Sequence, residues 1–254
     1  MQSIGNWQSK GLGDGLVTLP RILIGALLAV VVVGAAGASS WWFFLREDNQ
    51  LATSAPAVPT GLARTATTST ASGGSLAFAI IPASSEAAYF ADEKLASLPL
   101  PSTAKGSTKD LSGTFYLTPD GLALDPSRPS TFTVNLKTLT SDKDMRDRRV
   151  QSQGLETGTY PSASFTATSV TGYDPAKPAS EEQDLTLIGT MDLHGVQKEL
   201  TWDVKARREG DVVTALATVK FKFADFNIPV LNIAGFVSVQ DSVTLQVQVV
   251  AQAS

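Results

Sequence analysis

The densest group of reactive side chains is a charged run near the middle of the chain. It comprises Asp142, Asp144, Arg146, Asp147, Arg148 and Arg149. Arginine guanidinium groups and backbone amides bind phosphate well, so this run could hold an anionic headgroup such as a diphosphate. A solvated helix face with internal ion pairs, or an Arg146–Asp147 anchor between a helix and the rest of the fold, would use the same residues. We favour this structural interpretation.

The other candidates for chemistry are few. His194 is the single histidine, and it precedes Gly195 at a predicted hairpin turn, so no second histidine can share a metal ion with it. One histidine would still suffice for a nucleophilic triad, but we interpret His194 as a turn residue. Glu181, Glu182 and Asp184 lie in or beside a loop, where carboxylates are usually only solvated. We predict no catalytic residue, no metal, no cofactor and no enzyme.

Composition excludes further classes of function. The chain has no cysteine, which rules out disulfides, thiol chemistry and cysteine metal sites. Its net charge is −4, so there is no electrostatic case for nucleic acid binding, which needs a clustered basic surface.

A long apolar run lies close to the N-terminus. Residues 22–45 contain no charged side chain, and at 1.5 Å per residue they would form a helix of roughly 36 Å, enough to cross a membrane. Trp41 and Trp42 lie at its far end, where such rings favour the headgroup region. We predict a single transmembrane helix over 22–45. A buried core helix would be shorter and less uniformly apolar.

Flanking charges suggest the orientation of this segment. Lys10 and Arg21 precede it, whereas Arg46 alone follows closely. This bias predicts a short cytoplasmic N-terminus over 1–21 and an extracytoplasmic remainder, periplasmic or extracellular. A cleaved signal peptide is the alternative, because Ala36-Gly37-Ala38 fits a cleavage site. Either way the rest of the chain would be exported.

Residues 46–74 are predicted to form a flexible linker. This stretch is rich in Ser, Thr, Ala and Pro and has almost no large apolar side chain after Leu62, so little burial can offset the cost of ordering it. We expect it to act as a tether that holds the following domain off the bilayer.

From Ser75 onward the main signal is alternation of apolar and polar residues, which is typical of strands with one buried face. We expect about eight strands, near residues 75–81, 108–118, 131–139, 162–173, 184–193, 196–208, 212–224 and 237–250. Turn sequences such as Pro119-Asp120-Gly121 separate them. One short helix is predicted over Asp142 to Gln151, capped by Ser141. Ser85 to Ser97 is ambiguous between strand and helix.

Long antiparallel strands with one apolar face favour an all-β barrel, because closure removes exposed strand edges. Its inward stripe would either fill the interior or surround a cavity for one slender ligand. The members of this stripe are Phe115, Phe132, Val134, Phe165, Leu187, Trp202, Phe221 and Phe223.

Residues 75–254 resemble the YceI-like family. The likeness rests on four runs in order: Thr138 to Asp142 with Arg146-Asp147, then Tyr160 to Phe165, then Leu187 to Lys198, and finally Asp225 to Ile228 with Asp241 to Val243. The family's usual opening has a Trp and a His-Ser pair, whereas this chain has Leu76 to Pro82 followed by Ser84-Ser85-Glu86.

The resemblance implies a lipocalin-like antiparallel β-barrel of about eight strands that binds a polyisoprenoid or similar amphiphilic lipid in its lumen. It brings no catalytic residues. We therefore expect a membrane-tethered, extracytoplasmic lipid-binding or lipid-carrying barrel, with the inward stripe as the ligand-binding wall. The alternative is a structural or protein-interaction module of the cell envelope with a filled barrel.

Overall fold

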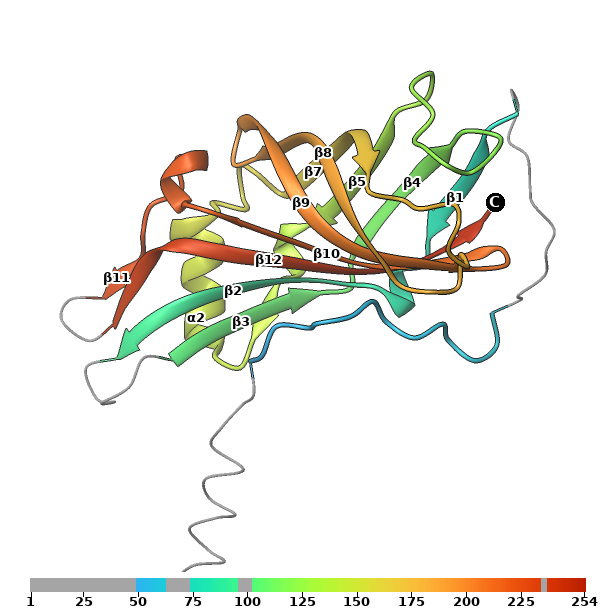
Figure 1. The fold of residues 1–254 in the computed structure, drawn as a ribbon. Helices are drawn as coiled ribbons and strands as arrows, with labels where there is room; N and C mark the ends of the chain where they lie inside the picture. Colours follow the sequence, from blue (N-terminus) through green and yellow to red (C-terminus); the bar gives the residue numbers. More distant parts are fainter. Residues whose placement is uncertain (1–48, 63–73, 96–101, 234–236) are drawn as a thin grey trace, which may run out of the picture. The chain divides into compact units, whose positions relative to one another are not determined.

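The computed structural model describes residues 49–62, 74–95, 102–233 and 237–254 (Figure 1). The predicted cytoplasmic segment 1–21 and transmembrane helix 22–45 lie outside these residues. Within the described ranges no helix has the length and apolar character needed to cross a membrane.

The regular secondary structure of the described residues is mostly β-strand. Its strands are β1 (Leu76–Ile80), β2 (Glu86–Leu95), β3 (Ser102–Thr108), β4 (Leu111–Leu117), β5 (Ser130–Asn135), β6 (Thr140–Ser141), β7 (Ser162–Thr171), β8 (Gln183–Leu193), β9 (Val196–Glu209), β10 (Val212–Phe221), β11 (Asn232–Ile233) and β12 (Val237–Ala253). Its helical elements are α2 (Asp144–Arg149), a π-turn (Val150–Gly154) and 3-10 turns at Pro82–Ser84, Leu136–Thr138 and Phe223–Phe226.

The strands form a closed antiparallel barrel. The pairing order is β1-β4-β5-β7-β8-β9-β10-β12, and β1 also pairs with β12, which closes the ring of eight strands. Along the edge that meets β1 near its end, β12 first pairs with β2, from Val237 to Gln248, and β2 in turn pairs with β3. The structure thus confirms the predicted all-β barrel.

At two positions around the barrel, two successive strands separated by a kink occupy the place of one long strand. β1 and β2 lie one after the other along the same edge of β12, and β4 and β3 lie in the same way along β1 and β2. The first kink is the turn at Pro82–Ser84. Ser85 holds this turn against β12, because its hydroxyl accepts from the Val250 N–H at 3.0 Å and donates to the Ile81 carbonyl at 2.9 Å.

The predicted elements agree with the observed ones apart from a few differences. The ambiguous stretch from Ser85 contains strand β2. The short strand β3 was not predicted, because its sequence STAKGST lacks large apolar residues. Ser141 does not cap the helix as expected. Lys143 is the N-cap residue, and Ser141 binds Asp147 inside the helix instead.

Residues 49–62, which we call the strap, differ from the flexible linker predicted over 46–74. The strap lies against the outer surface of the barrel and is drawn in blue in Figure 1, running from the α2 end toward the β1 end. Ala55 and Val58 are buried, and Val58 packs with Val212 and Val250 on the outer faces of β10 and β12. Val212 and Val250 are apolar although they point outward, where polar residues are expected, because the strap covers them.

Side chains of the barrel hold the backbone of the strap. Gln246, which is buried, accepts from the Ala52 N–H at 2.8 Å and donates to the Ala52 carbonyl at 2.9 Å. Glu182 accepts from the Ala55 N–H at 2.7 Å, and Arg207 donates to the Pro56 carbonyl at 2.8 Å. The strap is therefore fixed by paired polar groups as well as by apolar burial, although its composition resembles that of a linker.

The double hydrogen bond from Gln246 gives a test of the docked strap. Gln246→Ala removes both bonds to Ala52. We expect this change to destabilise the docked position of the strap by about 1–3 kcal/mol, so that the strap detaches more often. Hydrogen exchange of the Ala52 amide should then accelerate. Gln248→Ala is the matched control, because Gln248 lies two residues along the same face of β12. Equal exchange rates in both variants would contradict the role of Gln246.

Candidate functional site

The barrel encloses a cavity of about 820 Å³. Its wall is formed mostly by apolar side chains from the ring strands. The structure places all eight residues of the predicted inward stripe around this cavity: Phe115, Phe132, Val134, Phe165, Leu187, Trp202, Phe221 and Phe223. Their role in binding a ligand stays a prediction, but their position on the wall is now defined.

Small side chains keep the lumen open. Alanines occupy several inward positions, among them Ala104 on β3, Ala163 on β7, Ala206 on β9, and Ala215 and Ala217 on β10. An eight-stranded barrel is just wide enough either to be filled by large side chains or to hold a small ligand. Alanine in place of Leu or Phe shifts this barrel toward the second case. The aromatic stripe alone did not reveal these positions.

Aromatic pairs stiffen the wall. Phe78 and Phe115 stack with ring centroids 5.1 Å apart, and Phe165 meets Trp202 edge to face at 5.6 Å. Such pairs contribute beyond the burial of their area. The wall therefore has a defined shape around the cavity, which favours a preformed site over one that collapses when empty.

One end of the cavity, which we call the α2 mouth, is lined by Lys143, Met145, Arg149, Pro229 and Leu231. Lys143, Met145 and Pro229 are exposed, so the cavity reaches the surface here. The loop that carries Leu231 lies beside the π-turn, where a Cβ on Gly154 would come within 3.6 Å of the Leu231 side chain.

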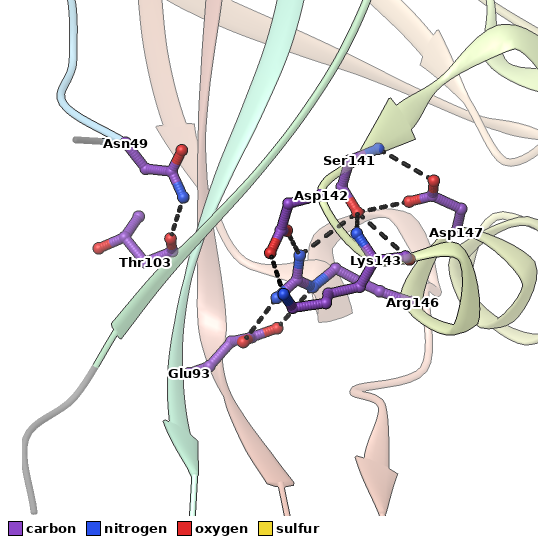
Figure 2. Close-up of polar contacts among 8 residues, drawn as sticks. All are labelled: Asn49, Glu93, Thr103, Ser141, Asp142, Lys143, Arg146 and Asp147. Atoms are coloured by element: carbon purple, nitrogen blue, oxygen red, sulfur yellow. Dashed lines mark hydrogen bonds and ion pairs between the residues drawn. The ribbon is translucent and has the colours of Figure 1, made fainter. Parts of the chain in front are cut away.

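A buried ion pair anchors α2 across this mouth (Figure 2). Arg146 binds Glu93 of β2 through two hydrogen bonds, of 3.0 Å from Nε and 3.1 Å from a terminal nitrogen. The Arg146 guanidinium also binds Asp142. Burial lowers the pKa of Arg146, but its bonds to Glu93 and Asp142 outweigh this and raise it overall. Arg146 is thus held by carboxylates, as the structural interpretation of the charged run expected.

Asp147, the next residue of α2, links the helix to Ser141 of β6. Ser141 donates to Asp147 through its N–H at 3.0 Å and through its hydroxyl at 2.5 Å, which ties the helix to β6. Burial raises the pKa of Asp142, whereas hydrogen bonds from Lys143 and Arg146 lower it and prevail. The charged run therefore positions α2 through Arg146 and Asp147, and the charge of Arg146 is neutralised by Asp142 and by Glu93 of β2.

Tyr89 of β2 brings a phenol into the cavity wall near the same ion pair. Burial raises the pKa of Tyr89 to about 12, and the positive charge of Arg146 opposes this shift. Tyr89 lies opposite Gly106 of β3, where an added Cβ would come within 2.3 Å of the ring. Glycine at 106 therefore makes room for the Tyr89 ring.

The opposite mouth is lined by Asp120, Leu122, Tyr173, Ala179 and Arg208. The Arg208 guanidinium lies over the Phe78 ring, 5.0 Å from its centroid, and its Nε donates to the Gly210 carbonyl at 2.8 Å. Charged groups thus stand at both ends of the cavity and apolar groups between them, which suits a long apolar chain with a polar terminus.

His194 is a structural residue of the barrel end. It is buried at the turn between β8 and β9 with a φ of 53°, and its ring lies 4.5 Å from that of Tyr160. Its Nδ1 is 3.2 Å from the Phe226 carbonyl and its Nε2 is 3.0 Å from a Glu156 carboxylate oxygen. Because both partners are acceptors, a neutral ring can donate to only one of them, and an imidazolium to both.

The loop carboxylates also have structural partners. Glu182 holds the strap, and Asp184 pairs with Lys205 at 2.7 Å. Among the described residues, no group of three or more His, Cys, Asp or Glu side chains is placed to hold a metal ion.

Comparison with known proteins gives a consistent result. A sequence profile of the YceI-like domain matches residues 78–251. Protein YceI of Escherichia coli O17:K52:H18 (strain UMN026 / ExPEC) is 32% identical over 130 residues, which cover 48% of this chain and 62% of that protein. Protein YceI of Salmonella paratyphi B is 33% identical over 134 residues, with the same shares. The chain thus spans less than two thirds of the length of these relatives.

Solved structures share the fold. Burkholderia cenocepacia BcnA matches with a TM-score of 0.52 at 18% identity, covering 68% of this chain and 99% of that one. A polyisoprenoid binding domain from Saccharophagus degradans implicated in plant cell wall breakdown matches with a TM-score of 0.54 at 18% identity, covering 70% and 99%. At these identities the likeness establishes the barrel fold alone.

The ion pair at the α2 mouth gives a mutational test. Arg146→Met leaves Glu93 buried without its partner, and we expect a loss of about 3 kcal/mol in the free energy of unfolding, measured by chemical denaturation. Arg148→Met makes the same change on the exposed face of α2 and should cost no more than about 0.5 kcal/mol. Similar losses in the two variants would show that the pair does not anchor the helix.

The other carboxylate partner of Arg146, Asp142, predicts how acid affects stability. The pKa of Asp142 is lowered in the folded state, so its contribution is present above its unfolded pKa and is lost as the pH falls through its folded pKa. We expect acid to destabilise the wild-type protein more than the Asp142→Asn variant over this range. Parallel stability profiles of the two proteins would contradict the assignment.

His194 gives a second test of stability. In His194→Ala the buried Phe226 carbonyl loses its partner, which should lower the free energy of unfolding by about 1–3 kcal/mol. Glu156→Gln changes only the more exposed partner, and its effect should be smaller. If His194→Ala unfolds at the same denaturant concentration as the wild type, the histidine does not tie these turns together.

Proposed function

We propose that the barrel binds one slender lipid of the polyisoprenoid class in its lumen, because the chain belongs to the YceI-like domain family. The observation that carries this proposal is the cavity of about 820 Å³ enclosed by the closed barrel and lined by apolar side chains. A pocket of several hundred Å³ with such a lining is typical of small-molecule sites.

The energetics of the cavity suit a hydrocarbon chain. Each buried CH₂ contributes about 0.8 kcal/mol, so a chain of several isoprene units gains enough to offset the cost of its ordering. The wall offers aromatic and aliphatic contacts along its length, and Tyr89, Glu93 and Arg146 provide polar groups at one end. An amphiphile with a long apolar tail and a compact polar head fits this distribution better than a polar metabolite does.

A filled barrel serving as a structural or protein-interaction module is the competing hypothesis. It requires large side chains to occupy the interior. Inward alanines at 206, 215 and 217 and the volume of the cavity argue against such packing. The lipid-binding function therefore accounts for an interior that the competing hypothesis would leave unexplained.

We further propose that residues 22–45 anchor the barrel in the cell membrane, with residues 75–254 on its extracytoplasmic side. This part of the proposal rests on the sequence, namely the long uncharged apolar run and the excess of Lys and Arg before it. An anchored barrel would take up or release its lipid close to a bilayer, where such lipids are dissolved.

A substitution that fills the lumen tests lipid binding. Ala217 faces the cavity from the middle of β10, and Ala217→Trp should occupy the space of the ligand. We expect native mass spectrometry to show geranylgeraniol bound to the wild-type protein and not to this variant. Thr201→Trp places the same ring on the outer surface and should bind as the wild type does. Circular dichroism would establish that both variants are folded.

Two outcomes of this experiment would contradict lipid binding in the lumen. If the wild-type protein binds no isoprenoid after gentle delipidation, or if Ala217→Trp binds it as well as Thr201→Trp does, the lumen is not the lipid site.

A further inference from the structure

The strap determines where the chain reaches the barrel. Its first residue, Asn49, donates from Nδ2 to the carbonyl of Thr103 on β3 at 2.8 Å. Thr103 and its neighbour Ser102 pair with Asp92 and Glu93 of β2. Since Glu93 binds Arg146, Asn49 lies close to the α2 mouth, and Figure 2 shows both contacts in one view.

The remainder of the strap runs away from this mouth. It binds Gln246 through Ala52 and Arg207 through Pro56, and it then packs Val58 against Val212. The strap is fixed along this path, so the chain that precedes Asn49 joins the barrel at the α2 end and not at the end where β1 begins.

Very little chain separates Asn49 from the apolar run. Only residues 46–48 lie between residue 45 and Asn49, and four residue steps extend at most about 14 Å. A flexible linker over 46–74 would let the barrel tumble freely. With the strap docked, Asn49 can lie no farther than this short reach from the end of the apolar run, so an anchor over 22–45, as proposed above, would keep the α2 end of the barrel near the membrane.

The surface of the α2 end suits contact with lipid. Four large apolar side chains are exposed among the described residues, and three of them, Leu51, Met145 and Val230, lie on the strap or near this mouth. Met145 has 62% of its surface exposed and Val230 has 40%. Leu122, the fourth, lies at the opposite mouth. Met145 on α2 and Val230 on the loop before β11 can both enter a lipid headgroup region at little cost.

Two of the cationic groups at this end are already paired with carboxylates. Arg146 is neutralised by Glu93 and Asp142, and Lys143 also pairs with Asp142 at 3.1 Å. Charged groups that already have partners lose less solvation energy on approaching a surface than isolated charges do.

From these observations we propose that the α2 mouth is a docking surface for the lipid bilayer and that the strap holds it there. Lipid would then pass between the membrane and the lumen through this mouth without crossing bulk water. This inference rests on the proposed lipid-binding function and membrane anchor, and its test separates the three.

Fluorescence quenching by lipid tests the orientation directly. The chain has no cysteine, so Met145→Cys, Val230→Cys and Leu122→Cys each give one labelling site. The labelled full chain is reconstituted into vesicles of phosphatidylethanolamine and phosphatidylglycerol with brominated acyl chains. We expect severalfold quenching of labels at positions 145 and 230 and none at 122. Quenching at 122 equal to or greater than that at 145, or no quenching at 145 and 230, would overturn the proposal.

Further measurements distinguish failure of the membrane anchor, of lipid binding and of the strap. If the full chain does not float with the vesicles, the anchor is wrong and the docking proposal falls with it. If labels at 145 and 230 are quenched while native mass spectrometry finds no lipid in the barrel, docking is supported and the lipid-binding function fails. A long Gly/Ser insertion between Asp48 and Asn49 should reduce the quenching at 145, and unchanged quenching would show that the strap does not hold the mouth at the membrane.

Discussion

The architecture depends on the pairing of β12 along both of its edges. One edge of this 17-residue strand pairs with β10, and the other pairs with β2 and then with β1. An unpaired edge would leave a row of backbone donors and acceptors open to other chains. Closure at β12 instead creates an enclosed interior, so the lumen, its two mouths and the platform for α2 all follow from this single set of hydrogen bonds.

Alternation along the chain was enough to predict the barrel, most of its strands and the stripe of eight residues around the cavity. Alternation reports which face is buried, but it does not report the length of the side chains opposite. Whether the interior is hollow depends on residues such as Ala206 and Ala215, which are too small to stand out in a pattern of apolar positions. Strand β3 was not predicted because its inward residues, Ala104, Gly106 and Thr108, are also too small to give a clear apolar pattern.

Other features were hidden because they depend on distant partners. The composition of residues 49–62 suggests a linker, and only their contacts with Gln246, Arg207 and Val250 give them an ordered path. Ser141 precedes a helix and has the right chemistry to cap it, yet the Asp147 carboxylate is a better partner for its hydroxyl and N–H. His194 was placed correctly at a turn, but its burial between Phe226 and Glu156 arises from segments far away in the sequence.

The docked strap also bears on how the barrel can be produced without its N-terminal segment. A truncated chain that started at Ser75, where the alternating strands begin, would uncover Val212, Val250 and the amide of Gln246 on the outer face of β10 and β12. Exposed apolar patches of this kind promote self-association. A truncated chain that keeps residues 49–62 would retain its own cover and should stay monodisperse at concentrations where the shorter one precipitates.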